Sequence, residues 1–206
     1  MNNLITHLIK DGWLKSQNII DAFTKIKRQD FLPSDKKELS QLNEALPIGF
    51  NQTISQPLTV AFMLELLAPQ KGDKVLDIGA GSGWTIGLLS HIVGEKGKVF
   101  GLEIIPELVQ FAKENLGKYQ FIKEGRVQVI LADGSKGYSQ EAPFDKILCS
   151  AEVKDSLPNV WKEQLKIGGR IVSPIKNSIW LFEKQKDGSF VGTEYPGFVF
   201  VPLVSN

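Results

Sequence analysis

The segment from Lys74 to Leu89, KVLDIGAGSGWTIGLL, constrains the fold of this chain more than any other stretch. A short apolar and β-branched run ends in an acid, and glycines follow at the alternate positions 79, 81 and 83 before an apolar, helix-like pattern resumes. Glycine lets the backbone turn with positive φ and lets a ligand lie against bare main chain. The order strand, tight glycine turn, helix therefore predicts the first unit of a nucleotide-binding α/β sheet.

The next predicted strand, Val99–Leu102, ends in Glu103, where a carboxylate can accept hydrogen bonds from both ribose hydroxyls of an adenosine. The glycine spacing is G-x-G-x-G rather than the G-x-G-x-x-G of dinucleotide folds, and Asp77 lies just ahead of it. An acid beside the turn repels a pyrophosphate but suits a cation. S-adenosylmethionine carries an ammonium and a sulfonium and has no phosphate, so the pattern favours it over NAD. The alternative is an α/β domain whose glycines only make a turn.

Length and composition fit one compact domain. With 206 residues, 42% of them hydrophobic, the chain can bury a sizeable core. The net charge of +1, from 24 basic and 23 acidic side chains, argues against a dedicated nucleic-acid binder. No signal peptide or membrane-spanning run is recognisable, and the single cysteine excludes internal disulfides. We therefore expect a cytoplasmic protein that binds neither nucleic acid nor membrane.

Strand and helix patterns alternate along the chain. The predicted helices cover residues 2–28, 58–67, 105–116 and 156–165, and the later predicted strands cover residues 126–131, 144–149 and 170–174. Residues 28–43 are predicted as a loop with a short turn, the glycine pair at 168–169 as a helix stop, and residues 179–183 with 198–201 as a closing hairpin. The alternation predicts a doubly wound, mostly parallel sheet with helices on both faces.

Four polar side chains follow predicted strands of this sheet, namely Asp77, Glu103, Asp133 and Ser150. Ligands of such sheets bind at the carboxyl ends of the strands, so we expect these residues to form one site. Asp77 is expected to anchor the glycine turn or to meet the amino group of the cofactor. Asp133 is expected to meet the adenine amino group. A capping role for Asp77 and an ordinary turn acid at Asp133 are the alternatives.

Five segments of the chain resemble the protein-L-isoaspartate O-methyltransferases, which repair isomerised aspartate in aged proteins. The segments are 28–33 (RQDFLP), 46–57 (LPIGFNQTISQP), 75–83 (VLDIGAGSG), 142–145 with 163–172, and 200–203 (FVPL). Many methyltransferases share the glycine turn, whereas QTISQP ahead of it combined with FVPL is far more specific. The resemblance implies a seven-stranded, Rossmann-like, S-adenosylmethionine-dependent methyltransferase fold with extra N-terminal helices. It also implies methyl transfer to the free α-carboxylate of isoaspartyl proteins and peptides.

In domain terms, residues 1–206 are expected to form a single methyltransferase domain. Residues 1–70 would supply a helical region and the substrate and cofactor loop, packed on a cofactor-binding sheet of residues 71–206. We expect the protein to be a monomer.

Methyl transfer to a carboxylate needs no general base, because the nucleophile is ionised at pH 7. The protein has to orient and desolvate it. Thr53 and Ser55 can hydrogen-bond the substrate carboxylate or the cofactor without adding charge, and the resemblance implies that Ser55 is the active-site residue. The alternative is that both hydroxyls only cap the helix that begins near Pro57.

The remaining site residues follow from the glycine turn and the strand ends. The predicted cofactor-binding set is Thr53, Ile54, Ser55, Asp77, Gly79, Gly81, Gly83, Glu103, Ile104, Asp133 and Gly134. No cluster of His, Cys and acids in the sequence resembles a metal site. Cys149 is expected to be a small buried hydrophobe, and Trp84 a core residue or one that packs on the cofactor.

The sequence departs from the family pattern mainly on the side of the acceptor. Gln41 and Asn43 stand where an aromatic residue and an aspartate are usual, and Glu152 adds an acid near the expected substrate mouth. The turn after the fifth strand is shortened to residues 175–178. These departures motivate an alternative, a related methyltransferase with another acceptor. A protein that binds the cofactor without turnover is the third hypothesis.

Overall fold

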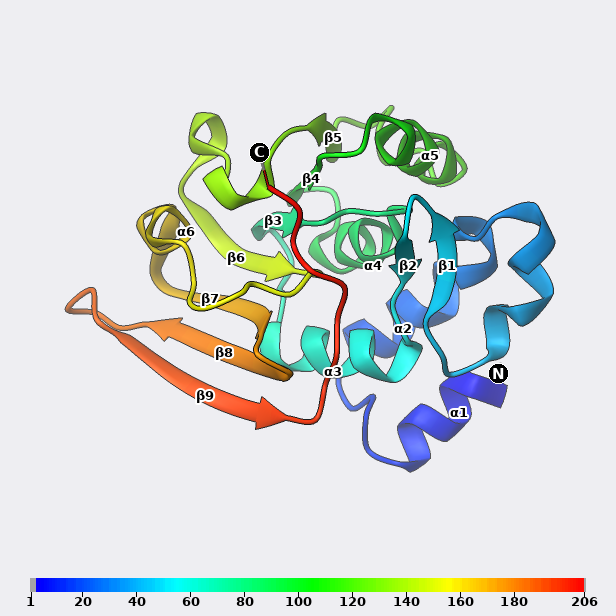
Figure 1. Ribbon diagram of the computed structural model, residues 1–206, viewed down its shortest axis with the longest axis horizontal. Helices are drawn as coiled ribbons and strands as arrows, with labels where there is room; N and C mark the ends of the chain where they lie inside the picture. Colours follow the sequence, from blue (N-terminus) through cyan, green and yellow to red (C-terminus); the bar gives the residue numbers. More distant parts are fainter. Residues whose placement is uncertain (1–2, 206) are drawn as a thin grey trace.

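Seven strands form one sheet in the computed structural model, which describes residues 3–205 (Figure 1). They are β3 (Lys74–Ile78), β4 (Lys98–Glu103), β5 (Val127–Leu131), β6 (Phe144–Cys149), β7 (Leu165–Ile175), β8 (Ser178–Lys184) and β9 (Phe190–Pro196). The order is β5-β4-β3-β6-β7-β8-β9, and only β8 and β9 run antiparallel to their neighbours. The predicted mostly parallel, seven-stranded sheet is confirmed. The chain builds outward from β3 to β5 and then returns to place β6 on the other side of β3, which makes the β3 end the point where such sheets bind ligands.

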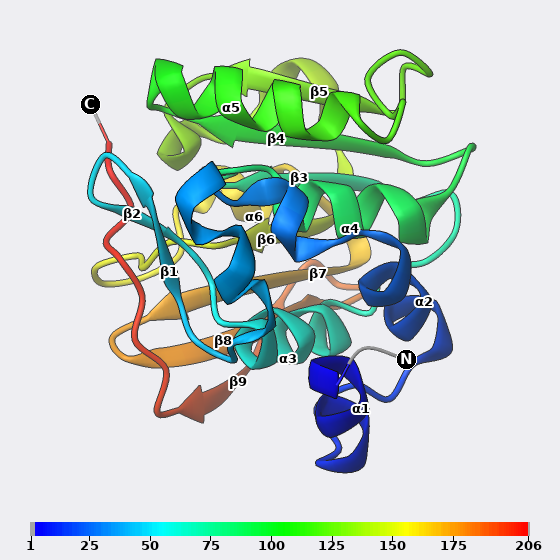
Figure 2. The ribbon, with the colours of Figure 1, turned by 90° about the vertical axis from the view of Figure 1, so that its right-hand side faces the viewer.

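The helices lie on both faces of the sheet, with most of them on one face (Figure 2). They are α1 (Asn3–Lys10), α2 (Gln17–Lys25), α3 (Pro57–Leu67), α4 (Trp84–Val93), α5 (Pro106–Gly117) and the short α6 (Asn159–Glu163). Four 3-10 helices join them: η1 (Arg28–Phe31), η2 (Ser34–Gln41), η3 (Gly134–Lys136) and η4 (Ser139–Glu141). The helical stretch predicted over residues 2–28 is wrong as a continuous helix: α1 ends before Gly12, whose φ of 76° is not helical, and α2 begins only at Gln17. Residue 2 lies outside the described residues. None of the described helices is long and apolar enough to cross a bilayer.

Side chains of the central strand β3 alternate between the two hydrophobic cores, one on each face of the sheet. In β3, Val75 packs into a cluster that includes Phe23 of α2 and Leu64 of α3, whereas Leu76 belongs to a second cluster around Trp161 of α6. Successive side chains of a strand point to opposite faces, so one buried strand supplies both cores. The N-terminal helices thereby complete the hydrophobic core of the first face.

A two-stranded hairpin, β1 (Leu46–Gly49) with β2 (Gln52–Ile54), precedes α3. Phe50 and Asn51 at its tip have φ of 54° and 56°, the left-handed conformation that tight hairpin turns use at both central positions. The turn brings the chain back so that Thr53 and Ser55 lie at the carboxyl edge of the large sheet. Turn-forming residues in the sequence thus build a hairpin that the sequence alone did not predict.

The loop with a short turn that the sequence predicts over residues 28–43 is wrong, because the structure places the two 3-10 helices η1 and η2 there. The charged composition of the segment gives no apolar pattern that would predict these helices. They are held by contacts of Arg28 and Phe31, which are both buried. Such contacts are invisible to a periodicity argument.

The predicted helix 156–165 is present, but it is shorter at both ends than predicted. The helix is only α6, Asn159–Glu163, because Pro158 disfavours helical backbone in the residue before it. Strand β7 then begins at Leu165, and residues 166–169 bulge out of it, since the register passes from Phe144 opposite Leu165 to Lys146 opposite Arg170. The glycine pair therefore interrupts a strand rather than ending a helix, with Gly168 at φ 75°.

The predicted hairpin of residues 179–183 with 198–201 is also wrong in its second strand. The partner of β8 is β9, whose residues from Val191 to Glu194 are exposed, so it lacks the apolar alternation that marks a half-buried strand. Residues 198–204 instead leave the sheet and cross over the carboxyl ends of its strands (Figure 1). There the Glu152 amide donates to Val201 O at 2.8 Å, and the Leu203 amide donates to Glu152 O at 2.8 Å.

Candidate functional site

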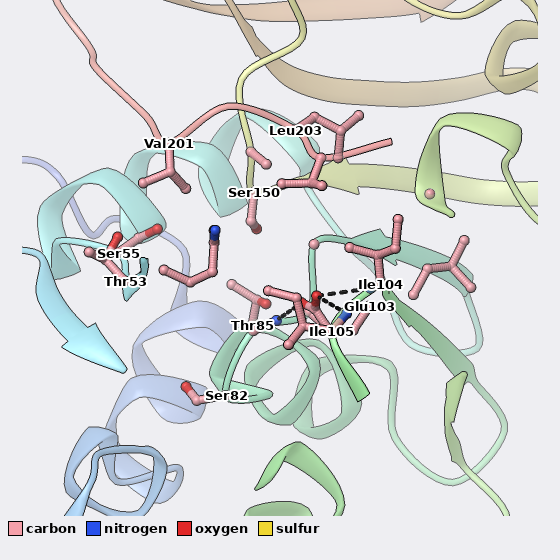
Figure 3. Close-up of a pocket in the computed structure, with 18 of the residues that line it drawn as sticks. Thr53, Ser55, Ser82, Thr85, Glu103, Ile104, Ile105, Ser150, Val201 and Leu203 are labelled. Carbon is pink, nitrogen blue, oxygen red and sulfur yellow. Dashed lines mark hydrogen bonds between the residues drawn. The ribbon is translucent and has the colours of Figure 1, made fainter. Parts of the chain in front are cut away.

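A hollow opens at the carboxyl ends of β3, β4 and β6, where the sheet reverses its winding direction (Figure 3). We call it the first hollow. Its walls come from the β2 end, the glycine turn, the residues after β4 and β6, and the crossing segment Val201–Val204. Separate parts of the sequence thus converge on one cavity at the position that doubly wound sheets use for ligands.

Most of the predicted cofactor-binding residues line this hollow. Those that do are Thr53, Ile54, Ser55, Gly79, Gly81, Glu103, Ile104 and Gly134. Those that do not are Asp77, Gly83 and Asp133. Ser150, expected at the same edge of the sheet, also lines it.

The glycine turn has the predicted positive φ, with values of 77°, 52° and 89° at Gly79, Gly81 and Gly83. Its amide groups are already used inside the protein. The Gly79 and Ala80 amides both donate to Leu102 O at 3.0 Å, and the Gly81 amide donates to Glu103 Oε2 at 2.8 Å. A turn that cradles phosphate needs its N–H groups directed at the ligand. In this turn the amides of residues 79, 80 and 81 are committed to β4 instead.

Glu103 lies folded against the glycine turn, as the dashed lines of Figure 3 show. Besides the Gly81 bond, its Oε1 accepts from the Ile104 and Ile105 amides at 2.8 and 3.0 Å. A carboxylate offers roughly four lone-pair positions, so about one, on Oε2, is left for a ligand. The side chain is only 6% exposed. Glu103 therefore shapes the turn in addition to facing the hollow.

Asp77 lies completely buried behind the hollow. Thr85, which does line the hollow, donates its hydroxyl to Asp77 Oδ2 at 2.5 Å, while Oδ1 has no partner within residues 3–205. Burial, with a smaller contribution from Glu103, raises the pKa of Asp77 to about 7, against the Thr85 hydrogen bond, which lowers it. The carboxyl group therefore holds Thr85 in the first turn of α4, and within the described residues no hydrogen bond joins it to the glycine turn itself.

The charges around the first hollow decide which kind of nucleotide it fits. Among the described residues that line it, Glu103 is the only charged side chain, and none is Lys, Arg or His. A pyrophosphate would meet an acid and no basic group, whereas a cationic ligand meets a favourable field. Apolar surface from Leu102, Ile104 and Ile105 offers a place for a flat ring. The site fits S-adenosylmethionine and not a dinucleotide.

Thr53 and Ser55 lie on the opposite wall from Glu103 (Figure 3). Both also line a second hollow of about 480 Å³, which shares Thr53, Ser55, Ser150 and Val201 with the first. Neither hydroxyl makes a hydrogen bond within the described part of the chain, and neither caps α3. The alternative that they serve only as caps is therefore not supported.

Asn43 supplies the cap that α3 needs. Its Oδ1 accepts from the Leu58 amide at 2.9 Å, and its carbonyl accepts from Gln56 Nε2 at 2.8 Å. An aspartate in the same place would offer the same acceptor, so the departure at Asn43 leaves the local structure intact. Glu152, the other departure, lines neither hollow; its backbone pairs with Val201 and Leu203. Gln41 likewise lines neither.

Two predicted site residues, Asp133 and Gly83, stabilise the backbone around the first hollow and do not line it. Asp133 caps η3, with Oδ1 accepting from the Ser135 amide at 3.0 Å and hydroxyl at 2.7 Å, and it lies 3.3 Å from the Lys136 ammonium. Gly83 begins α4 where a Cβ would lie 3.2 Å from both Ala112 and Leu116, so its place allows α5 to approach closely. Cys149 is fully buried, as predicted for a small hydrophobe.

Sequence reasoning missed part of the wall. Ser82 lies within the glycine turn and Thr85 in the first turn of α4, and these positions could have revealed them. Trp84 is 4% exposed within the core, as one of the two interpretations expects, and it also lines the hollow; contact with the cofactor stays a prediction. The crossing segment Val201–Val204 gave no local signal of its position. Among residues 3–205, no group of three or more His, Cys, Asp and Glu side chains is arranged to hold a metal.

Comparison with known proteins identifies the family. The family model of protein-L-isoaspartate(D-aspartate) O-methyltransferase matches residues 1–206. The chain is 40% identical over 205 residues to the protein-L-isoaspartate O-methyltransferase of Methanopyrus kandleri, covering 98% of this chain and 89% of the relative. It is 41% identical over 205 residues to the enzyme of that name from Thermococcus onnurineus, covering 97% and 91%. This chain belongs to the protein-L-isoaspartate O-methyltransferase family.

A solved structure shares the fold of this isoaspartyl methyltransferase. The Plasmodium falciparum family member, crystallised in complex with S-adenosyl-L-homocysteine, superposes with a TM-score of 0.89 at 21% identity, covering 100% of this chain and 98% of that one. The isoaspartyl methyltransferase is an S-adenosylmethionine-dependent carboxyl methyltransferase, in agreement with the charge and shape of the first hollow.

Proposed function

We propose that the enzyme acts on isoaspartyl residues of damaged proteins and peptides, with S-adenosylmethionine in the first hollow, the acceptor in the second, and Ser55 between them. Thr53 and Ser55 carry this proposal, because they line both hollows and keep their hydroxyls out of internal hydrogen bonds. A group shared by two binding hollows is the group that can align their contents.

Bound in the first hollow, S-adenosylmethionine would supply a methyl group activated by its positive sulfur. The acceptor carboxylate is ionised without help, so the protein has to hold it and remove water. In our proposal the Ser55 hydroxyl donates to one carboxylate oxygen and leaves the other free to attack. Val201, which lines both hollows, would contribute apolar surface that displaces solvent.

For the cofactor, we assign one ribose hydroxyl to the remaining lone pair of Glu103 Oε2. Gly79 and Gly81 line the hollow with bare main chain, and we assign the adenine to the part lined by Ile104 and Gly134. Asp77 is assigned an indirect role through Thr85.

Methyl transfer to a matched peptide pair tests this proposal. One peptide carries isoaspartate and the other normal aspartate at the same position, and both are assayed with labelled S-adenosylmethionine. We expect base-labile label on the isoaspartyl peptide alone. Ser55→Ala should lower kcat by about 10- to 100-fold, because a hydrogen bond to a charged group contributes about 1.5–3 kcal/mol.

Ser139→Ala, which removes an exposed hydroxyl from η4 at a position that lines neither hollow, is the matched control and should keep wild-type kcat. Equal labelling of the normal peptide, or label that survives base, would refute the carboxylate acceptor. Wild-type kcat in Ser55→Ala would remove Ser55 from the mechanism.

We also propose that the enzyme works as a monomer in the cytoplasm. The single cysteine is free and buried, so the described fold uses no disulfide, which fits a reducing compartment. Light scattering of the purified protein at assay concentration tests the first point: a mass of twice 22.9 kDa would contradict it.

A further inference from the structure

Arg28 is a buried arginine whose partners are all neutral. The side chain is 5% exposed at the start of η1. Its Nη1 donates to Leu42 O at 2.9 Å and Ser40 O at 3.3 Å, and its Nη2 donates to Glu44 O at 2.7 Å and Ser55 O at 3.2 Å. Buried arginines usually meet a carboxylate. This one is occupied by main-chain carbonyl groups instead.

The four carbonyls belong to two stretches of chain that border the second hollow. Three come from residues 40–44, of which Asn43 and Glu44 line that hollow, and the fourth belongs to Ser55. The planar guanidinium has a fixed fork of donors, which sets the distance and angle between the groups it joins. Arg28 therefore fixes Ser55 relative to the neighbouring border of the hollow at Asn43 and Glu44.

The other side of the guanidinium lies over Trp84, with Arg28 Cζ 5.5 Å from the ring centre. Trp84 lines the first hollow, so Arg28 connects the wall of one hollow to the border of the other. Two donors of this pair, Arg28 Nε and Trp84 Nε1, are buried with no partner anywhere in residues 3–205. A pair kept only for stability would be expected to satisfy its buried donors.

Tyr119, just beyond α5, holds the main chain of Lys27 and the side chain of Asp30 on either side of Arg28. The Lys27 amide donates to the Tyr119 hydroxyl at 2.9 Å, and that hydroxyl donates to Asp30 Oδ2 at 2.6 Å. The ring of Phe31 stacks on Tyr119 with 5.8 Å between centres. The guanidinium thus extends from a fixed base, and its burial lowers the pKa of Arg28 to about 10, which leaves it protonated at neutral pH.

We propose that Arg28 is a positioning residue for methyl transfer, which holds the Ser55 main chain, and with it the Ser55 hydroxyl, in place between the two hollows. Arg28 lines neither hollow, so it acts through Ser55 and not on the ligands. This inference rests on the proposed role of Ser55.

A double-mutant cycle on the full-length enzyme tests it. Wild type, Arg28→Lys, Ser55→Ala and the double variant are assayed with the isoaspartyl peptide. The kcat of each is divided by the fraction of sites that bind S-adenosylhomocysteine in calorimetry. Lysine keeps the charge but loses the fork, so we expect a roughly 10-fold or greater loss of kcat, with the Kd of S-adenosylhomocysteine changed by less than about 3-fold. In the Ser55→Ala background the same change should lower kcat by less than about 2-fold, since Arg28 then has no hydroxyl to place.

Arg126→Lys is the matched control, because Arg126 also lies over an aromatic ring, 4.8 Å from the centre of Phe121, and lines neither hollow. It should keep wild-type kcat. Full additivity of Arg28→Lys and Ser55→Ala, or normalised kcat within about 2-fold of wild type in Arg28→Lys, would overturn the inference. If Ser55→Ala itself leaves kcat unchanged, the proposed role of Ser55 is refuted. That result differs from the results that would overturn the role of Arg28 alone, so the two failures are distinguishable.

If Arg28→Lys does not fold, the kcat of Tyr119→Phe tests the positioning role of Arg28 instead. This substitution leaves Arg28 in place but removes the hydroxyl that holds residues 27 and 30. A roughly 3-fold or greater loss of kcat that disappears in the Ser55→Ala background supports positioning. Wild-type kcat in Tyr119→Phe would overturn it.

Discussion

Asp77 and Glu103 end neighbouring strands, yet their carboxylates differ in surroundings and in function. Glu103 accepts three backbone amides and faces the first hollow, whereas Asp77 is sealed behind it with one hydroxyl donor. Desolvation is the main reason why the pKa of Asp77 rises to about 7. At the scale of single residues, the site thus includes a buried acid whose charge depends on pH within the range of ordinary assays.

Replacing Asp77 by asparagine should reveal the stability that the folded protein loses when the buried carboxyl group ionises. The raised pKa means that the folded protein holds a proton between about pH 4 and 7 that the unfolded chain has lost, so wild-type stability falls as pH rises through this window. The amide side chain of the variant cannot ionise and escapes that loss. We expect the free energy of unfolding of Asp77→Asn relative to wild type to increase by roughly 3 kcal/mol from about pH 5 to about pH 8.

Urea unfolding of the cofactor-free proteins at both pH values measures the difference, and any constant cost of the amide cancels. Asp155→Asn, at the surface, is the control and should show no such trend. A pH-independent difference for Asp77→Asn would mean that Asp77 is ionised throughout in the folded protein.

At the scale of elements, α3 depends on a residue outside itself. Its N-cap, Gln56, makes no side-chain cap bond, and Asn43 from the preceding segment accepts the Leu58 amide instead. The cap therefore ties the start of α3 to residues 42–44, beside Ser55. Helix stability and site geometry are coupled at this point.

Removing this cap should cost about 1 kcal/mol, within the roughly 0.5–2 kcal/mol range of lost N-caps. We expect Asn43→Ala to lower the free energy of unfolding by this amount. Asn43→Asp should be at least as stable as wild type, because it keeps the acceptor and places a negative charge at a helix N-terminus. Denaturant titrations of the three proteins measure both effects. Equal destabilisation of both variants would show that the side-chain acceptor is not the stabilising feature.

At the scale of the whole molecule, residues from both ends of the sequence meet over one sheet edge. The crossing segment Val201–Val204 completes the first hollow, opposite the hairpin β1–β2 from the N-terminal region. It is held by hydrogen bonds between Glu152 and residues 201 and 203, and its only contact with the two hydrophobic clusters of the described residues is the partly buried Leu203, at the edge of the second. Its loss should therefore affect binding more than folding.

Truncation after Val201 tests this expectation. It removes Pro202, Leu203 and Val204 from the wall of the hollow and exposes its contents to water. We expect the Kd of S-adenosylhomocysteine, measured by calorimetry, to rise about 10-fold, as the loss of roughly 1.4 kcal/mol of apolar contact would produce. Truncation after Val204, which leaves the wall whole, is the control. Unchanged affinity after the longer truncation would show that the segment does not contact the cofactor.

The predictions that succeeded rest on local signals. The glycine turn, the acid after β4 and the parallel strands follow from residue type and spacing within short windows. The predictions that failed chiefly concern residues 28–43, 168–169 and 198–201, where buried side-chain contacts, bulges and long-range pairing decide. A glycine pair has the same local pattern whether it ends a helix or bulges a strand.

By itself, the sequence determined the alternation of parallel strands and helices along the chain and the place of the glycine turn. It also determined that the site has no basic residues to bind phosphate. These properties depend on backbone preferences and on residue types close together in the chain. Only the tertiary structure decided that Glu103 folds onto the turn, that Asp77 lies behind Thr85, and that Arg28 reaches Ser55. Each of these three features depends on which distant segments pack together and on the water that this packing excludes. A single short stretch of sequence encodes neither the packing nor the exclusion of water.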